Sequence, residues 1–380
     1  MVLANARRCW QWRRNIGEEI VKKRFRNVVL LCACALSIVA LGGCSMQKMA
    51  GNAVIEYSHD EAIPYLMSQG DLASACQMGQ AMGPVLMSFH RVGLDPAQIG
   101  IGTHMAAGMC AEMDQREHEL ARYRALYEQR STEAQDALVR EKQAHSLAAS
   151  RMILAYENAV AAYGDLSEKC PEYKSDTDAL LSLLGLASGA LAILHDFNSE
   201  KAVGISLDIP GKIEKGAQCF DDDKWWGMPT ALRAAIWLSI PGSGPEGVDP
   251  IEAMKTAAAK GDAQGVFLAR AMQIMMLATI GQPENMCQSM TEAKLKDGNG
   301  DFAMLNAYAR SMIQHQADIA WTKAKGYRAP LNWAQCPVAE AASTMDEERA
   351  NDLLEGLFDD EDVDADSTPA DAVPAETPTT

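Results

Sequence analysis

The chain lacks the short motifs that identify many enzymes. Its 380 residues contain no nucleophile elbow, phosphate-binding glycine loop, dinucleotide fingerprint or zinc-binding histidine pair on one helix. The histidines are scattered, and no two have metal-ligand spacing beside a third ligand: His59, His90, His104, His118, His145, His195 and His315. We therefore expect no enzymatic activity, catalytic residue, metal or cofactor, although distant side chains could still converge into a catalytic site.

Basic residues are fewer than acidic residues. Lys and Arg number 34 against 51 Asp and Glu, so the net charge is −17 and nucleic acid is excluded as a partner. Much of the acidic excess lies after Thr344, where thirteen acidic residues are opposed only by Arg349. A segment this acidic cannot bury enough apolar surface to offset its ordering entropy. We expect residues 344–380 to form a disordered acidic tail.

The first 43 residues have the order of a bacterial lipoprotein signal sequence. A basic stretch precedes an apolar block at residues 28–40, and a helix of that length spans only ~20 Å, too little for a ~30 Å hydrocarbon core. Leu41, Gly42, Gly43 and Cys44 then resemble a lipobox, in which the Cys is acylated. An ordinary secretory leader with an incidental Cys is the alternative.

The anchor predicts a location. Ser45 follows Cys44, in place of the Asp that resembles an inner-membrane retention signal. We expect a protein held at the outer membrane by lipid on Cys44, with a linker at residues 44–58 and a helical domain at residues 59–343 facing the periplasm.

Six cysteines remain after the leader and Cys44 are set aside. They stand in an oxidising compartment and lack the close spacing of a zinc or thioredoxin-like site, so disulfides are expected and free buried thiols are the alternative. Six cysteines allow fifteen connectivities, and the sequence does not decide between them. Pairing of neighbours gives sequence separations of 34, 49 and 49, which suit a staple between adjacent antiparallel helices. The candidate pairs are Cys76 with Cys110, Cys170 with Cys219 and Cys287 with Cys336.

Strand signals are almost absent, and helical periodicity dominates. Only Val203 to Ile209 alternate, as one short extended segment or a covering loop. Gly-Asp pairs at 70–71, 261–262 and 300–301 are each expected to end one helix and cap the next. The last two pairs are 39 residues apart, close to a tetratricopeptide period. The sequence predicts an all-α fold of divergent helix-hairpin repeats, resembling an α-solenoid.

Residues 109–163 contain neither Gly nor Pro. We expect two helices that turn near Ser131, with Thr132 and Gln135 as a capping box, or else a projecting coiled hairpin.

Large apolar side chains mark a candidate pocket or interface. Met105, Met109 and Met113 recur every fourth residue beside His104 and Cys110, which suits core packing or copper(I). The 21 methionines overall, with Met272, Met275 and Met276 on another helix, could instead form the wall of an apolar pocket. Two adjacent Trp on one helix or loop are not expected to face the same core, so one of them could line a cleft. The candidate residues are Trp225, Trp226, Trp237, Met105, Met109, Met272 and Met276.

The order of these features resembles the T-component lipoproteins of tripartite ATP-independent periplasmic (TRAP) transporters, often called TatT. The resemblance rests first on the lipobox, an early apolar helix, and the Leu94-Asp95-Pro96 break before a second apolar helix. It also rests on Trp225-Trp226-Gly227 ahead of a helix at 231–237 and on the later helices that begin with Gly-Asp. They cover most of residues 60–325. The stretch at 109–163, the six cysteines and the acidic tail depart from the family pattern.

The resemblance implies tetratricopeptide-like hairpins around an apolar cavity or pore. It also implies a periplasmic substrate-binding subunit as partner, a hydrophobic small-molecule ligand and, in some members, homo-oligomers. The function we expect is therefore that of a lipid-anchored accessory binding protein for transport. The alternative is a scaffold for another envelope complex, with a filled groove and no ligand cavity.

Overall fold

The computed structural model describes residues 46–293 and 298–331, and these contain helices and loops but no β-strand. This confirms the all-α prediction. The leader, Cys44, Cys336 and the acidic tail lie outside the described residues. Residues 46–57, which the sequence placed in a linker, are helical. The other elements are η1 (Ser58–Ala62), α2 (Ile63–Met67), α3 (Leu72–Met87), η2 (Ser88–Val92), α4 (Ala97–Tyr127), α5 (Ser131–Tyr163), α6 (Asp176–Asn198), α7 (Ile209–Ala217), α8 (Met228–Ser239), α9 (Pro250–Gln264), α10 (Leu268–Thr279), α11 (Pro283–Glu292), η3 (Gly300–Phe302) and α12 (Ala303–Lys325).

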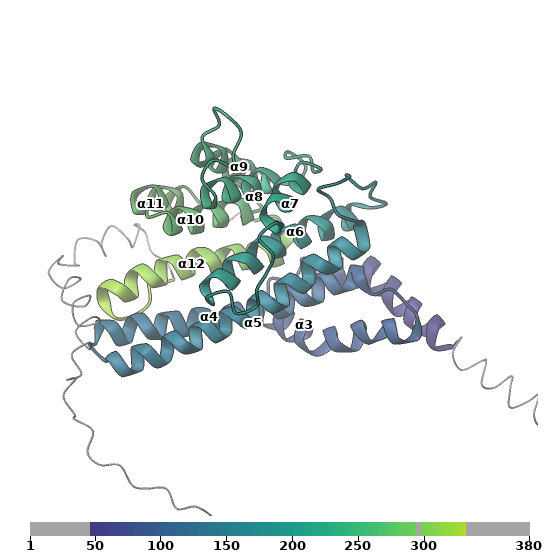
Figure 1. The fold of residues 1–380 in the computed structure, drawn as a ribbon, viewed down its shortest axis with the longest axis horizontal. Coiled ribbons are helices and arrows are strands. Elements are labelled where there is room, and N and C mark those ends of the chain that lie inside the picture. Colours follow the sequence, from purple (N-terminus) through teal and green to yellow (C-terminus); the bar gives the residue numbers. More distant parts are fainter. Residues whose placement is uncertain (1–45, 294–297, 332–380) are drawn as a thin grey trace, which may run out of the picture.

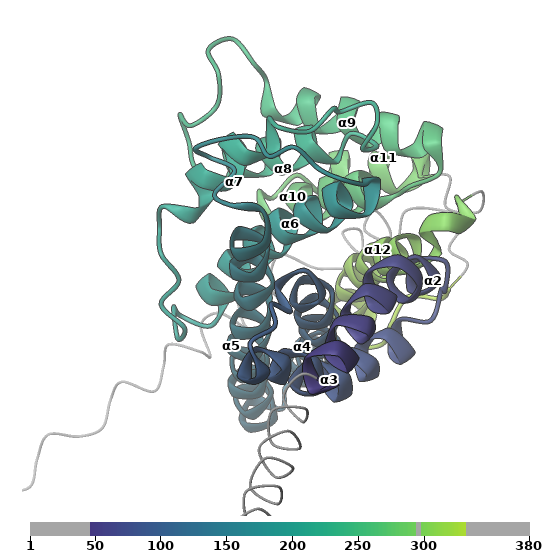
Figure 2. The ribbon, with the colours of Figure 1, turned by 90° about the vertical axis from the view of Figure 1, so that its right-hand side faces the viewer.

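The helices form two groups with two helices between them. The long hairpin of α4 and α5, with α3 beside it, makes one group, and the short helices α7 to α11 make the other (Figure 1). Helices α6 and α12 lie between the groups, as the second view also shows (Figure 2). Most consecutive helices pack against one another, which is the arrangement of helix hairpins.

Helix α6 is the most apolar long helix of the described part. Among the helices of the described residues, α6 alone has the length and composition to cross a membrane. However, 67% of its most apolar 18-residue stretch is buried inside the fold. Leu181, Leu183 and Leu184, which together span one turn, are all buried. Helix α6 therefore packs as a core helix that both groups share.

The expected turn in the long Gly/Pro-free stretch is confirmed. Helix α4 ends at Tyr127, and α5 begins at Ser131. Gln129 makes the turn in a left-handed conformation with φ of 58°. The capping-box prediction is wrong, because the N-cap is Arg130 and makes no side-chain cap hydrogen bond. The helix starts one residue before Thr132, so the hydroxyl of Thr132 already lies within the first turn.

The three Gly-Asp pairs have different roles. Asp71 caps α3 as predicted, accepting a hydrogen bond from the backbone N–H of Ser74. Gly261 and Asp262 instead lie in the last turn of α9, where Asp262 accepts from Arg270 at 3.0 Å. Before α12, Asn299 caps the short helix η3, and Asp301 lies inside η3. The second and third pairs are therefore not equivalent, and the prediction that each caps a helix holds only for the first.

The break before α4 lies where Leu94-Asp95-Pro96 indicated. Gly93 ends η2 with a positive φ of 76°. Asp95 then accepts a hydrogen bond from the backbone N–H of Ala97, the first residue of α4. The carboxylate thus satisfies one of the donors that a helix leaves open at its start.

Two predicted disulfides are confirmed. Cys76 and Cys110 join α3 to α4 with their Cα atoms 5.1 Å apart. Cys170 and Cys219 join the loop before α6 to the chain after α7, with 5.3 Å between Cα atoms. Cys287 is disulfide-bonded as well, whereas its predicted partner Cys336 lies outside the described residues.

The alternating segment after α6 is a covering loop. The buried Asp196 carboxylate accepts hydrogen bonds from three successive backbone N–H groups, those of Val203, Gly204 and Ile205. These bonds hold the loop against the end of α6, so the alternation in the sequence does not produce a strand.

Contrary to expectation, the adjacent side chains of Trp225 and Trp226 face the same core. Both are buried, with 6% and 5% of their surface exposed, and their rings pack edge to face at 5.5 Å. Trp226 has a positive φ of 56°, and Gly227 follows with φ of 74°. This pair of left-handed residues turns the chain sharply, so both side chains enter one core.

Candidate functional site

A cleft of about 680 Å³ opens between the two groups of helices. Helices α4, α5, α6, α10 and α12 form it, and residues at the start of α11 contribute its edge. Its lining is mixed in character: Glu112, Gln115, Arg116, Glu119, Arg122, Tyr123, Glu141, His145, Leu191, Leu194, His195, Asn198, Met275, Ala278, Thr279, Gly281, Pro283, Met286, Met312, His315, Gln316, Ile319, Ala320, Lys323 and Ala324.

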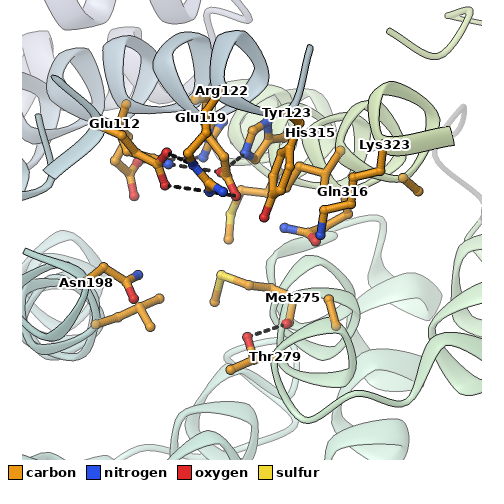
Figure 3. Close-up of a pocket in the computed structure, with 18 of the residues that line it drawn as sticks. Glu112, Glu119, Arg122, Tyr123, Asn198, Met275, Thr279, His315, Gln316 and Lys323 are labelled. Carbon is orange, nitrogen blue, oxygen red and sulfur yellow. Dashed lines mark hydrogen bonds and ion pairs between the residues drawn. The ribbon is translucent and has the colours of Figure 1, made fainter. Parts of the chain in front are cut away.

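One wall of the cleft is polar and comes from α4. Its residues recur every three or four positions, so they share one face of the helix. Figure 3 shows the α4 side chains and their α12 neighbours together on one side of the open space. We call this face the polar wall; its α4 members are Glu112, Gln115, Arg116, Glu119, Arg122 and Tyr123.

Glu112 is the centre of a buried network at the inner end of the polar wall. One carboxylate oxygen accepts from Nε2 of His195 at 2.9 Å, and the other accepts from the Tyr308 hydroxyl at 2.5 Å. The guanidinium of Arg116 lies 3.8 Å away. His195 in turn meets His145, with 2.7 Å between their Nδ1 atoms. Residues of α4, α5, α6 and α12 are thereby joined in one chain of hydrogen bonds.

A second network follows one or two turns further along α4. Glu119 accepts hydrogen bonds from Nε2 of His315 at 2.8 Å and from Gln115 at 3.0 Å. Arg122 donates two hydrogen bonds to the Glu141 carboxylate, at 2.6 and 3.1 Å. The bidentate pair ties α4 to α5 beside the cleft.

These contacts determine the ionisation of the cleft. Burial alone would raise the pKa of Glu112, but the hydrogen bond from His195 and the charge of Arg116 lower it. Burial would also raise the pKa of Glu119, but the hydrogen bond from His315 outweighs the effect of burial. The pKa of Glu119 is therefore lowered too. Burial and the neighbouring His195 lower the pKa of His145 to about 4. At neutral pH the two carboxylates are therefore charged and His145 is neutral.

Apolar side chains from α6, α10 and α11 form another part of the lining. Leu191 and Leu194 come from α6, Met275 and Ala278 from α10, and Met286 from α11. In Figure 3, Met275 lies across the open space from the α4 side chains. We call these five residues the apolar wall. Near this wall, the Thr279 hydroxyl donates a hydrogen bond to the Met275 carbonyl oxygen at 2.9 Å. The hydroxyl hydrogen is therefore already bonded within α10.

The outer end of the cleft carries a cation. The ammonium of Lys323 lies 4.2 Å from the centre of the Tyr123 ring, and the Arg122 guanidinium is 4.1 Å from the same centre. Arg122 is neutralised by Glu141. Lys323, by contrast, forms no ion pair with any carboxylate of residues 46–293 and 298–331.

The acidic and imidazole groups do not form a metal centre. Within the part of the chain that the structure describes, no set of three or more His, Cys, Asp or Glu side chains has a geometry that could hold a metal ion. The imidazoles of the cleft instead donate to carboxylates or to each other. Hydrogen bonding is the chemistry that this arrangement supports directly.

The residues predicted as a pocket or interface lie elsewhere. All seven are buried in the main hydrophobic core, and none lines the cleft: Trp225, Trp226, Trp237, Met105, Met109, Met272 and Met276. Met113, the third methionine of the α4 series, is 39% exposed. Met275, which the sequence grouped with Met272 and Met276, does line the cleft, together with Met286 and Met312.

The sequence held one signal for this site. The α4 residues from Glu112 to Tyr123 follow the helical spacing that the apolar residues of the same helix follow. When polar residues follow this spacing on a helix that packs between other helices, one polar face of the helix points into the protein. The histidines carried no such signal, because their partners are distant in sequence.

The chain matches no protein-family model, and no curated protein or solved structure is significantly similar to it.

Proposed function

We propose that this protein is a lipid-anchored binding protein of the bacterial cell envelope that takes an amphipathic small molecule into the cleft. The observation that carries the proposal is a cleft of about 680 Å³ with a polar wall facing an apolar wall. Ligand pockets in proteins have volumes of roughly 300–1,000 Å³. A scaffold with a filled groove would not need such a space.

The charges of the cleft support an anionic head group on the ligand. Glu112, Glu119 and Glu141 each receive at least two hydrogen bonds or ion contacts from the protein. Lys323 is the cation of the cleft that no described carboxylate neutralises, and it stands beside Tyr123 at the outer end. An anion there would complete a charge-assisted contact while its apolar part lies on Met275 and Leu194.

The same contacts favour binding over catalysis. A general acid at neutral pH needs a raised pKa, whereas the pKa values of Glu112 and Glu119 are lowered. Each imidazole nitrogen named in the networks is already committed to a partner. These side chains hold the helices in place around the cleft, which is the role a fixed binding site requires.

The setting we propose is a TRAP-type transport system, in which the protein acts as the lipid-anchored accessory component at the outer membrane. It would pair with a periplasmic substrate-binding subunit, and divergent tetratricopeptide-like hairpins would form its frame. The resemblance of the sequence to the T-component lipoproteins supports this setting. The cleft supplies the place for the hydrophobic ligand that such a component handles.

Native mass spectrometry of the protein purified from bacterial membranes tests the proposal. Wild type is expected to carry an additional organic mass that solvent extraction releases. Ala320 lines the cleft from α12, so Ala320→Trp should fill the space and remove that mass. Ala161 is exposed on α5 and does not line the cleft, so Ala161→Trp should keep it.

Two results would count against binding in this cleft. One is a wild-type protein without any additional mass, even after it is incubated with a fatty acid as an amphipathic anion. The other is an equal amount of bound mass in wild type and Ala320→Trp.

A further inference from the structure

The helix at residues 46–57 has an apolar face that the rest of the fold leaves open. Its three largest members have 67%, 68% and 65% of their surface exposed, namely Met46, Met49 and Tyr57. Val54 is 40% exposed, and the alanines between them are exposed as well. We call this face the N-terminal apolar face; it consists of Met46, Met49, Ala50, Ala53, Val54 and Tyr57.

The six residues lie on one side of the helix. At about 100° per residue they fall within an arc of roughly 140°. Gly51 and Ile55 lie on the other side, and they are buried and half-buried respectively. The apolar face therefore points away from the body of the protein.

Close packing fixes this orientation. A Cβ atom at Gly51 would come within 2.4 Å of Cδ1 of Leu94, so the helix backbone at Gly51 lies directly against the Leu94 side chain before α4. On the same side, the Lys48 ammonium would lie 3.1 Å from a Cβ at Gly93. The helix is thus docked through Gly51, Ile55 and Lys48, and in this position its apolar face points away from the body of the protein.

The chain outside the structure indicates what covers the face. Cys44, the residue proposed to carry the lipid, precedes Met46 by two positions, and two residues of extended chain reach at most ~7 Å. Acyl chains on Cys44 would therefore hold the first turn of this helix at the bilayer surface. In Figure 1 the helix, in dark purple, lies at one end of the molecule.

We propose that the N-terminal apolar face lies in the headgroup region of a phospholipid bilayer. The inference rests on the proposed acylation of Cys44 and adds a second contact that fixes how the domain stands on the membrane. Amphipathic helices that lie in the interface bury their apolar face by roughly 5–10 Å. Tyr57 and the 66%-exposed Tyr65 have the apolar ring and polar tip that suit this depth.

The charge around the face selects the kind of lipid. Glu56, Asp60 and Glu61 are exposed next to it, and Lys48 lies against the loop at Gly93. A local excess of carboxylates repels anionic lipids, so the contact depends on apolar insertion into zwitterionic phospholipid. Such binding should change little with salt.

Photolabelling from within the bilayer tests the proposal. The full chain is matured in a bacterial host, purified from membranes and placed in vesicles of phosphatidylethanolamine and phosphatidylcholine. The vesicles contain a phospholipid that carries a diazirine on its acyl chain close to the headgroup. The label is expected on residues 46–57. It should fall to background in a Met49→Glu/Val54→Glu variant whose melting temperature is unchanged.

A matched control uses exposed apolar residues on another helix. Val139 and Leu147 on α5 are 53% and 43% exposed, and Val139→Glu/Leu147→Glu should leave the labelling of residues 46–57 intact. The intact mass of the same sample reports acylation of Cys44 separately, so failure of the anchor and failure of the face can be told apart.

Three results would overturn the proposal. Labelling of residues 46–57 could be no stronger than that of α5 around Val139, or it could survive the Met49→Glu/Val54→Glu change. The third is a homodimer in native mass spectra that this variant converts to monomer, which would mean that a second copy of the chain covers the face.

Discussion

Nδ1 of His145 and Nδ1 of His195 lie 2.7 Å apart beside the cleft, so one of the two atoms must donate a hydrogen and the other must accept it. Double protonation would bring two N–H groups together. Facing this pair from α4 are Glu112, Glu119 and Arg122, whose charges partly compensate one another. The histidine pair is therefore stable while His145 stays neutral.

Unfolding should accordingly become easier as the pH falls from 6.5. In the unfolded chain His145 binds a proton below about 6.5, whereas in the folded protein its lowered pKa is about 4. The unfolded state thus holds more protons in this range, and the free energy of unfolding falls by at most about 3 kcal/mol. Urea unfolding at a series of pH values measures the slope.

His145→Asn is the control for this slope, because the amide can hydrogen-bond to His195 but does not titrate. Its unfolding free energy should change less than that of wild type between pH 6.5 and 4.5. Glu112 and Glu119 have pKa values lowered from 4.5, so their contributions are lost only below this window. Parallel curves for wild type and His145→Asn would refute the assignment.

Removal of the Glu112 charge should destabilise the protein strongly. Glu112→Gln leaves Arg116 without its buried counter-charge and disrupts the bonds from His195 and Tyr308. The loss of a buried partner costs about 3 kcal/mol. Chemical denaturation should show this difference, whereas Glu172→Gln at an exposed position should stay within about 0.5 kcal/mol of wild type.

Two glycines should respond in opposite directions to replacement by alanine. Gly227 has φ of 74°, and a Cβ there would lie 2.2 Å from the Ala257 carbonyl oxygen. Gly227→Ala should cost about 3 kcal/mol. Gly211 in α7 has nothing within 4 Å of its Cβ position, so Gly211→Ala should be neutral or stabilise by about 0.5 kcal/mol. Equal melting temperatures for the two variants would contradict the packing described here.

Lys323 should contribute to ligand affinity without contributing to stability. The ammonium makes no described ion pair and is exposed, so Lys323→Gln loses only a solvent-exposed contact with the Tyr123 ring and should change the melting temperature little. It should weaken binding of a fatty acid by about tenfold, the loss of one charge-assisted contact. Calorimetric titration compares the two proteins, and an unchanged Kd would remove Lys323 from the binding site.

Local signals in the sequence predicted the fold well. The break at Asp95 and the turn before Ser131 depend on neighbouring residues, and two cysteine pairs were predicted from their separations of 34 and 49. Asp262 does not cap a helix because α9 continues through it to Gln264, and its carboxylate accepts a hydrogen bond from Arg270 instead. The adjacent Trp residues share a core because Trp226 takes a backbone conformation that its residue type does not predict.

The cleft could not be predicted in the same way. Glu112 is 83 residues from His195 and 196 residues from Tyr308, and His145 is 50 residues from His195. Only the packing of α4, α5, α6 and α12 brings these side chains together. The Trp residues and four of the Met residues expected in a pocket wall fill the core, whereas the polar series on α4 and the methionines Met275, Met286 and Met312 line the cleft.

The most direct test of the account is a crystal structure of the protein as purified from bacterial membranes. We expect electron density of an organic molecule in the cleft, with its apolar part against Met275 and Leu194 and its polar end near Lys323. A cleft that holds only ordered water, with the ligand bound elsewhere on the protein, would contradict the proposed function.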